Sequence, residues 1–205
     1  MIGGISSEAQ LAFYEYADKI VQIPTLLLVA MGAVMLSRMS HVFHKNAEKA
    51  KETIGLSMDL SFVIGTSCGF GIFAVANELV AVYYGDGFLQ SGPILMALVP
   101  VVILFGWSNV LRMQYVIPNN MDSVYIKATI AGAIVNLVCN LVFIPKYQAY
   151  GATIGTLAAQ STVVLVFTIY VRKDLPLWGY FVRNIPLFII GSLMMVAIKI
   201  TQCFH

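Results

Sequence analysis

The polar side chains with the most potential for chemistry in this sequence stand inside long apolar runs. They are two acids, two bases and four amides: Glu15, Glu78, Lys19, Arg112, Asn109, Gln114, Asn136 and Asn140. An ionisable group inside a membrane span is costly unless it is paired or hydrated, so such groups are functional candidates by default. We therefore expect these eight residues to mark a path for a substrate or an ion.

Several of these candidates also have a purely structural explanation. Glu15 and Lys19 are four residues apart in the order that favours a helical ion pair, which would neutralise both. Asn136 and Asn140 lie one turn apart on one helix face, and amides in such places join neighbouring helices at ~0.6 kcal/mol per contact. The sequence leaves helix packing and substrate contact open for both pairs.

Arg112 and Glu78 fall toward the ends of their spans. Arg112 can anchor its helix by reaching the membrane surface, and Glu78 can be an interfacial carboxylate rather than a proton carrier. The pair His41 and His44 has metal-like spacing, but it lacks a third ligand and reads as solvated histidines. Without a Ser/His/Asp, Cys/His or metal-ligand cluster, we expect no enzyme activity, no metal site and no cofactor.

Composition places these residues in a membrane protein. Hydrophobic residues make up 59% of the chain and charged residues 11%, against about 25% charged in soluble domains. The mean hydropathy is +0.83, and the net charge of +2 gives no reason to expect nucleic acid as a partner. Membrane lipids are therefore expected partners. Three isolated cysteines, Cys68, Cys139 and Cys203, read as small core residues.

Apolar periodicity predicts an all-α fold, a polytopic integral membrane bundle of about six transmembrane helices. The expected spans cover residues 9–36, 54–84, 93–112, 124–144, 151–171 and 185–200. Pro24 and Pro100 should kink the first and third spans. Between the first two spans, residues 37–53 are the most charged stretch, which predicts a loop with a helical turn over 47–52.

Basic residues predict the orientation. If the first loop is cytoplasmic, nine of the twelve basic residues lie on the inner side, with Lys146 and Lys199 outside and Lys19 within a span. Six spans then put both chain ends outside, which is more natural for the back half of a longer protein. We therefore expect a truncated gene product, a fragment or a split protein.

Residues 136–160 form the most distinctive segment. Two asparagines four apart precede Pro145, which should end one helix, and small residues follow at Gly151, Gly155 and Ala159. Small residues at this spacing let a neighbouring backbone approach closely. The segment therefore predicts a hairpin of two membrane helices.

Five motifs carry a family resemblance. They are Tyr14-x-x-Ala17-x-Lys19-Ile20, Leu79-x-x-x-Tyr83-x-Gly85, Arg112-Met-Gln114-Tyr115, Asn136-x-x-x-Asn140-Leu-x-x-Ile144-Pro145-Lys-Tyr147, and Gly151-Ala152. With them, residues 1–175 resemble the C-terminal half of Wzx-type oligosaccharide-unit flippases, in the superfamily that also holds multidrug extruders and peptidoglycan-precursor flippases. Gln148 departs from the pattern, because a glycine usually follows the aromatic residue, and this puts the tight turn in question.

The resemblance implies one lobe of a two-lobe transporter in the inner (cytoplasmic) membrane, as a multi-pass protein. It implies a five-span bundle over 1–175, an additional span over 176–205 and a missing N-terminal lobe. The implied function is flipping of polyprenyl-diphosphate-linked oligosaccharide units for surface polysaccharide, with a lipid-linked oligosaccharide and an N-terminal lobe or a second copy as partners. The alternatives are a drug or metabolite cation antiporter of the same superfamily, and a non-transporting membrane scaffold or remnant.

Overall fold

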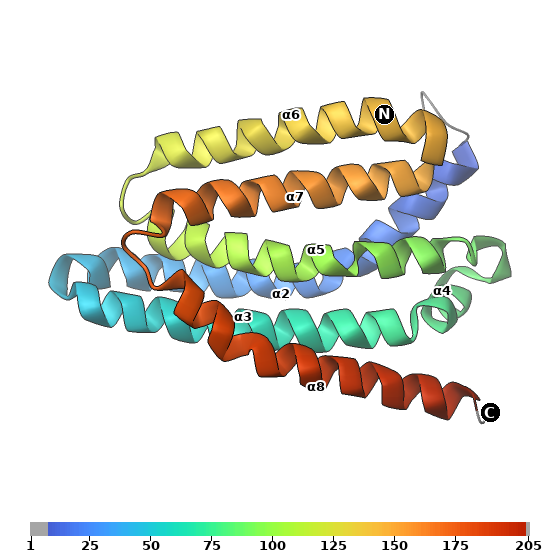
Figure 1. Cartoon of the computed structure of the whole chain (residues 1–205), viewed down its shortest axis with the longest axis horizontal. Coiled ribbons are helices and arrows are strands. Elements are labelled where there is room, and N and C mark those ends of the chain that lie inside the picture. The colour runs from blue at the N-terminus through green and yellow to red at the C-terminus, as the bar shows by residue number, and fades with distance from the viewer. Residues whose placement is uncertain (1–7, 204–205) are drawn as a thin grey trace.

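Every regular element in residues 8–203, the part that the computed structural model describes, is a helix. The side chains of residues 40–45 and 203 lie outside that description. Six helices are long and apolar enough to cross a membrane, which confirms the predicted all-α bundle (Figure 1). In order the elements are α2 (Glu8–Lys45), α3 (Ala47–Ala74), α4 (Ala76–Tyr84), η1 (Asp86–Phe88), α5 (Ser91–Leu111), η2 (Arg112–Val116), α6 (Asp122–Tyr147), α7 (Ala149–Val171) and α8 (Leu177–Cys203).

Helix α5 is the centre of the bundle. It packs against α2, α3 and α7, and more than half of its residues are buried. Its sequence is apolar on all sides, as expected of a helix surrounded by others. By contrast, α6 rests mainly on α7 and α8 mainly on α3, so both leave apolar side chains such as Ile134 and Leu193 exposed. In a membrane these faces meet lipid or another protein surface. The proposed separation of 176–205 from the rest stays a prediction.

The first connection differs from the prediction. The prediction of a charged loop over residues 37–53 is wrong, because α2 continues to Lys45 and α3 begins at Ala47. Only Asn46 separates them, and its side chain caps α3 by accepting a hydrogen bond from the Lys49 amide at 3.0 Å. Charged residues mark where a helix leaves the bilayer, but Lys, Arg, Glu and Ala are strong helix formers and do not end it. The side chains of His41 and His44 lie outside the described residues.

The second predicted span is also wrong in its bounds. It begins seven residues earlier than expected, at Ala47, and α3 ends at Ala74. At Val75 the backbone leaves the helical region (φ −114°, ψ 20°), and the shorter helix α4 continues from there. Helix α4 packs on α5 and buries Ala76 and Val80. The expected turn at Gly85 is confirmed, with φ at 81°.

Two further boundaries follow local backbone chemistry. Pro145 does not end its helix: α6 runs to Tyr147, and α7 begins at Ala149. Gln148 alone makes the turn, with φ 52° and ψ −123°, in a region that glycine normally occupies. The tight turn of the family pattern is therefore present without its glycine. Helix α8 begins at Leu177, eight residues before the predicted start of the last span.

The predicted kinks are only partly visible. Pro24 and Pro100 both lie inside continuous helices. Figure 1 shows α2 changing direction between its dark-blue and light-blue parts, whereas α5 looks nearly straight in that view.

Charge is unequally shared between the two ends of the bundle. The start of α2 and the end of α8, which are the termini of the described part of the chain, lie at one end (Figure 1). Nine basic residues lie at the other end, in connections or adjoining turns: Arg38, Lys45, Lys49, Lys51, Arg112, Lys127, Arg172, Lys173 and Arg183. That end, called the basic end below, also carries five acids, whereas the end with the termini carries five acids and three bases. That the basic end is cytoplasmic stays a prediction.

Candidate functional site

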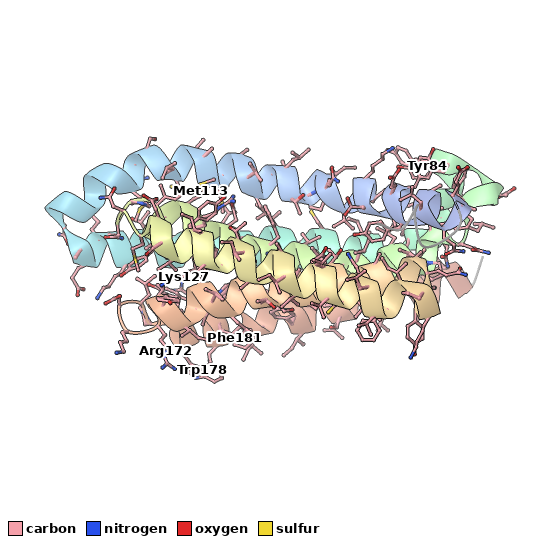
Figure 2. All side chains as sticks on the ribbon, turned by 90° about the horizontal axis from the view of Figure 1, so that it is seen from above. Tyr84, Met113, Lys127, Arg172, Trp178 and Phe181 are labelled. Carbon is pink, nitrogen blue, oxygen red and sulfur yellow. The ribbon has the colours of Figure 1, made fainter. Side chains whose placement is uncertain are left out.

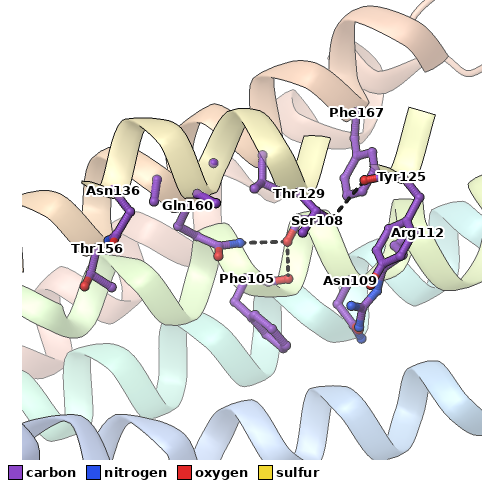
Figure 3. Close-up of a pocket in the computed structure, with 14 residues that line it drawn as sticks. Phe105, Ser108, Asn109, Arg112, Tyr125, Thr129, Asn136, Thr156, Gln160 and Phe167 are labelled. Atoms are coloured by element: carbon purple, nitrogen blue, oxygen red, sulfur yellow. Dashed lines mark hydrogen bonds between the residues drawn. The ribbon is translucent and has the colours of Figure 1, made fainter. Parts of the chain in front are cut away.

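Helices α5, α6 and α7 line an open cavity of about 400 Å³ with mixed polar and apolar walls. Three of the predicted residues line it, Asn109, Arg112 and Asn136. Figure 3 shows Arg112 and Tyr125 at one end of the row of lining side chains, and Asn136 and Thr156 at the other. The cavity therefore runs from near the basic end toward the middle of the bundle. We call it the polar cavity.

Two hydrogen bonds in series connect Arg112, at the basic end of the cavity, to α2. Its Nη2 donates to Asn109 Oδ1 at 2.9 Å, and Asn109 Nδ2 donates to the carbonyl of Leu28 at 2.7 Å. Asn109 is 1% exposed, and Gly32 gives it room, since a side chain there would collide with the amide. The guanidinium also lies 6.0 Å from the Tyr125 ring. Its Nε is buried without a hydrogen-bond partner.

The backbone at Arg112 is unusual. Residues Arg112–Val116 form a π-helical turn, in which the amide of Ile117 bonds to the carbonyl of Arg112 at 3.0 Å. Such turns insert one extra residue into a helix and often occur at functional sites. Because this turn begins at Arg112, it changes the direction of the side chains that follow. Periodicity in the sequence contained no signal for it.

Hydroxyl and amide groups continue the polar wall toward the middle of the bundle. Gln160 Nε2 donates to Ser108 Oγ at 2.8 Å, and Ser108 Oγ donates to the Phe105 carbonyl at 3.0 Å. Thr156 shares a hydrogen bond of 2.7 Å with Tyr14 of α2. These contacts cross from α7 to α5 and α2, so they both line the cavity and hold its walls together.

The far wall depends on close contact between α6 and α7. Asn140 Nδ2 donates to Asn136 Oδ1 at 2.9 Å, which confirms that the two amides share a face. A side chain at Gly155 would collide with Asn140, and one at Gly151 with the backbone of Phe143. The predicted hairpin with small residues at its seam is therefore present. Asn140 Oδ1 is buried without a partner.

Five predicted residues do not line the polar cavity. Asn140 donates a hydrogen bond to Asn136 but is not part of the lining. Gln114 is fully buried, and neither the oxygen nor the nitrogen of its side-chain amide is hydrogen-bonded. Glu15 and Lys19 are exposed on α2, and Glu78 is exposed in the first turn of α4. Their roles in a substrate or ion path stay predictions.

The ion pair between Glu15 and Lys19, one of the two alternatives left open by the sequence, is absent from residues 8–203. Lys19 Nζ instead lies 4.8 Å from the centre of the Tyr16 ring. Asp18 accepts a hydrogen bond of 2.6 Å from Gln22. The Lys19 ammonium therefore contacts the ring of Tyr16, and Glu15 does not neutralise its charge.

Five polar lining residues were not among the sequence candidates: Ser108, Tyr125, Thr129, Thr156 and Gln160. Gln160 carried a usable signal, since it is an amide inside an apolar run. The hydroxyl residues carried little, because Ser and Thr in helices commonly bond to their own backbone, as Thr129 does with the Tyr125 carbonyl at 2.9 Å.

The chemistry of the polar cavity is that of binding. Its described lining contains one charged residue, Arg112, and no acid. Guanidinium, amide and hydroxyl groups can donate hydrogen bonds to phosphate or sugar oxygens. Among the described residues there is no group of three His, Cys, Asp or Glu side chains that could hold a metal ion.

Six apolar helices, three of which line a polar cavity, define a multi-pass membrane protein of the transporter class. The family model described as "Lipid II flippase MurJ" matches residues 5–205, and the chain belongs to this family of lipid-linked glycan flippases. The family consists of transporters of the cytoplasmic membrane and not of enzymes.

Curated relatives show the same relationship at low identity. The chain is 24% identical over 174 residues to the "Putative O-antigen transporter" of Escherichia coli K12, covering 85% of this chain and 42% of that protein. It is 23% identical to the "Probable low-salt glycan biosynthesis flippase Agl15" of Haloferax volcanii, covering 76% and 33%. It is 24% identical to the "Lipid II flippase MurJ" of Bacillus subtilis 168, covering 91% and 35%. The chain thus spans about a third to two fifths of these relatives.

Proposed function

We propose that this chain forms one lobe of a flippase that moves a polyprenyl-diphosphate-linked oligosaccharide from the inner to the outer leaflet, for surface polysaccharide assembly. The observation that carries the proposal is the polar cavity inside an otherwise apolar bundle, with Arg112 at its basic end. A flippase must pass a hydrated anionic head through hydrocarbon while the lipid tail stays in the bilayer. A polar cavity that opens to alternate sides provides that path.

The charge of the cavity favours an anionic substrate over a cationic drug. A cation antiporter needs a carboxylate where the cation binds, and the described lining has none. The planar fork of Arg112 suits bidentate contact with phosphate. Glu15 and Glu78, the acids proposed for coupling to cations, lie outside this cavity.

The arrangement of amides favours transport over a scaffold. A scaffold would use its intraspan polar groups in helix contacts alone, whereas a transporter would also gather them around one space. Asn109, Arg112 and Asn136 come from two different helices and meet at the same cavity. Gln160, from a third helix, joins them.

We propose further that the lobe needs a second wall. The chain spans 33% to 42% of the curated relatives, and alternating access works by one lobe moving against another. Helices α2 and α6 both leave apolar side chains exposed, such as Leu26 and Ile134, and these faces suit such a contact. The second wall would be an N-terminal lobe or a second copy of this chain.

Arg112 provides the sharpest test of the substrate. Transport in a two-lobe protein should fall about ten- to hundredfold in apparent affinity for Arg112→Ala, because one charge-assisted contact of about 1.5–3 kcal/mol is lost. Arg112→Lys should recover only part, since it restores charge without the fork. Lys127→Ala, at the same end but outside the cavity lining, is the matched control. Normal transport by Arg112→Ala, at equal expression, would reject this role.

Lys19 is proposed as a second phosphate contact. It lies nine residues before Leu28 on α2, about 13 Å of helix further from the basic end. Lys19→Ala should reduce transport, and adding Glu15→Ala should not restore it, because the two residues form no ion pair in the structure. Recovery in the double variant would show that Lys19 acts only by neutralising Glu15.

Rescue of surface polysaccharide in a flippase-deficient strain tests the need for a second lobe. We expect no rescue by residues 1–205 alone and rescue when an N-terminal lobe is co-expressed. Full rescue by the chain alone, with only monomers in detergent and in lipid, would contradict the two-lobe proposal.

A further inference from the structure

A second hollow, separate from the polar cavity, lies on the other side of α7. It is an apolar groove of about 560 Å³ between α7 and α8, floored by α5. The two hollows share no lining residue. Both tryptophans of the chain, Trp107 and Trp178, line the groove. Thr168 is the one hydroxyl residue in its described lining, and its hydroxyl accepts a hydrogen bond of 3.1 Å from Trp107 Nε1. The groove therefore offers almost only hydrocarbon surface.

The length and depth of this groove match one leaflet of a bilayer. On α8 the lining extends from Leu177 to Phe188, which is about 16 Å of helix, or half of a hydrocarbon core of about 30 Å. Trp178, in the first turn of α8, is 76% exposed, as expected of a side chain at the headgroup level. The groove thus begins at the membrane surface of the basic end and ends near the middle of the bilayer.

Basic side chains lie directly beyond the open end of the groove. Arg172 follows Thr168 by four residues, so it continues the same face of α7 by one turn. Figure 2 shows Arg172, Trp178 and Phe181 along one edge of the bundle. Arg172 and Lys173 are exposed and line a polar hollow at the turn between α7 and α8.

Two of the other charged residues of that hollow are engaged. Arg183 is paired with Asp59, and Asp174 accepts a hydrogen bond of 2.8 Å from Tyr115. Glu48 and Glu52 also line the hollow, from the first turns of α3. Lys51, on α3, is a third cation of the hollow. Arg172 and Lys173 are the two that adjoin the α7 wall of the groove, and neither forms an ion pair with another described residue.

We propose that the groove binds an acyl chain of an anionic glycerophospholipid from the leaflet at the basic end, with the lipid phosphate held by Arg172 and Lys173. A phospholipid fits because its phosphate and its acyl chain lie at the depths of the basic pair and the groove. The transported polyprenyl lipid would place its diphosphate at Arg112, on the opposite side of α7. The bound phospholipid joins α8 to α7 and is not itself transported.

Tryptophan quenching tests this site directly. In the full chain carrying Trp178→Phe, Trp107 is the single tryptophan and sits in the groove. The protein is reconstituted in phosphatidylcholine bilayers with brominated phosphatidylglycerol or brominated phosphatidylcholine. Each basic residue near an anionic lipid gives roughly a fivefold preference, so the relative binding constant should favour phosphatidylglycerol by about tenfold or more.

Matched variants separate the basic pair and the groove from general effects. Arg172→Gln with Lys173→Gln should bring the relative constant to about one, whereas Lys146→Gln with Lys199→Gln, which removes two charges at the other end, should not change it. Val164→Phe, which fills the groove, should abolish quenching selectivity, whereas Ile169→Phe on an exposed face should retain it.

Three results would overturn the proposal. One is equal quenching by the two brominated lipids, and another is unchanged selectivity in the Arg172 and Lys173 double variant with its circular dichroism and melting retained. The third is displacement of brominated lipid by a polyprenyl phosphate but not by unlabelled phosphatidylglycerol, which would assign the groove to the substrate's own chain. All three leave the test of Arg112 in the polar cavity unaffected.

Discussion

Arg183 of α8 and Asp59 of α3 form an ion pair, with Nη2 and Oδ2 2.6 Å apart. Arg183 Nε also donates to Asp59 Oδ1 at 3.0 Å, and Asn184 Nδ2 donates to the same oxygen at 2.7 Å. Nearby, the Tyr180 hydroxyl donates to the carbonyl of Lys51 at 2.9 Å. Since α8 packs mainly on α3, these polar contacts fix the helix at its basic end.

Breaking this ion pair should loosen α8. Asp59→Ala removes the acceptor for three N–H donors, two from Arg183 and one from Asn184. We expect a loss of about 1–2 kcal/mol of unfolding free energy, which is less than for a buried ion pair because both side chains are partly exposed. Arg183→Ala should cost a similar amount, and the double variant less than the sum of the two. Chemical unfolding in detergent micelles measures the cycle. Strict additivity would show that the pair adds no stability.

Gly155 should tolerate no side chain while Asn140 stays opposite it. A methyl group there would collide with the Asn140 amide oxygen, so Gly155→Ala should destabilise the α6–α7 hairpin by about 1–3 kcal/mol. Asn140→Ala should relieve most of that loss. Gly179→Ala is the control, because no atom lies within 4 Å of the added methyl and alanine favours a helix. Thermal melting in detergent distinguishes the two sites.

Gln148 stands where a glycine would fit better. Its φ of 52° and ψ of −123° are strained for a residue with a side chain. Gln148→Gly should raise the unfolding free energy by about 1 kcal/mol, whereas Lys146→Gly, inside α6, should lower it by a similar amount. A loss of stability in Gln148→Gly would mean that the glutamine side chain makes a compensating contact.

The class of fold followed from composition and periodicity, but several helix ends did not. Apolar runs indicate where a chain crosses hydrocarbon, which is why the six spans were predictable. Helices continue past the membrane when the following residues are good helix formers, and residues 37–45 are an example. The bend at Val75 arises where α4 packs on α5, and that tertiary contact has no signature in a local window.

The polar cavity was predictable only in part, for a similar reason. Asn109, Arg112 and Asn136 were found because amides and charges in apolar runs are rare. The rotation of each helix about its axis decides which of the eight candidates lie close together. The π-helical turn at Arg112 changes that rotation locally. Gln114, two residues further on, is therefore buried away from the cavity.

Cysteine labelling tests the predicted orientation. In a version without Cys68, Cys139 and Cys203, single cysteines at Asn46 and Asp86 lie at opposite ends of the bundle, and both positions are exposed. If the basic end is cytoplasmic, an impermeant thiol reagent applied to intact cells should label Asp86→Cys and not Asn46→Cys. Both should react in permeabilised cells. The reverse pattern in intact cells would invert the topology.

Asn109 should act through Arg112 and not by binding substrate itself. Its two polar atoms are already engaged, one with the Leu28 carbonyl and the other with Arg112 Nη2, so its contribution is to hold the guanidinium in place. Asn109→Ala should therefore weaken apparent substrate affinity in a two-lobe protein by less than Arg112→Ala does. In the background of Arg112→Ala, the same change should have almost no further effect on affinity, although it should still lower stability, because the contact to α2 is lost. Gly32→Ala, which crowds the Asn109 amide, should resemble Asn109→Ala. Independent, additive losses of affinity from Asn109→Ala and Arg112→Ala would show that Asn109 contacts the substrate directly.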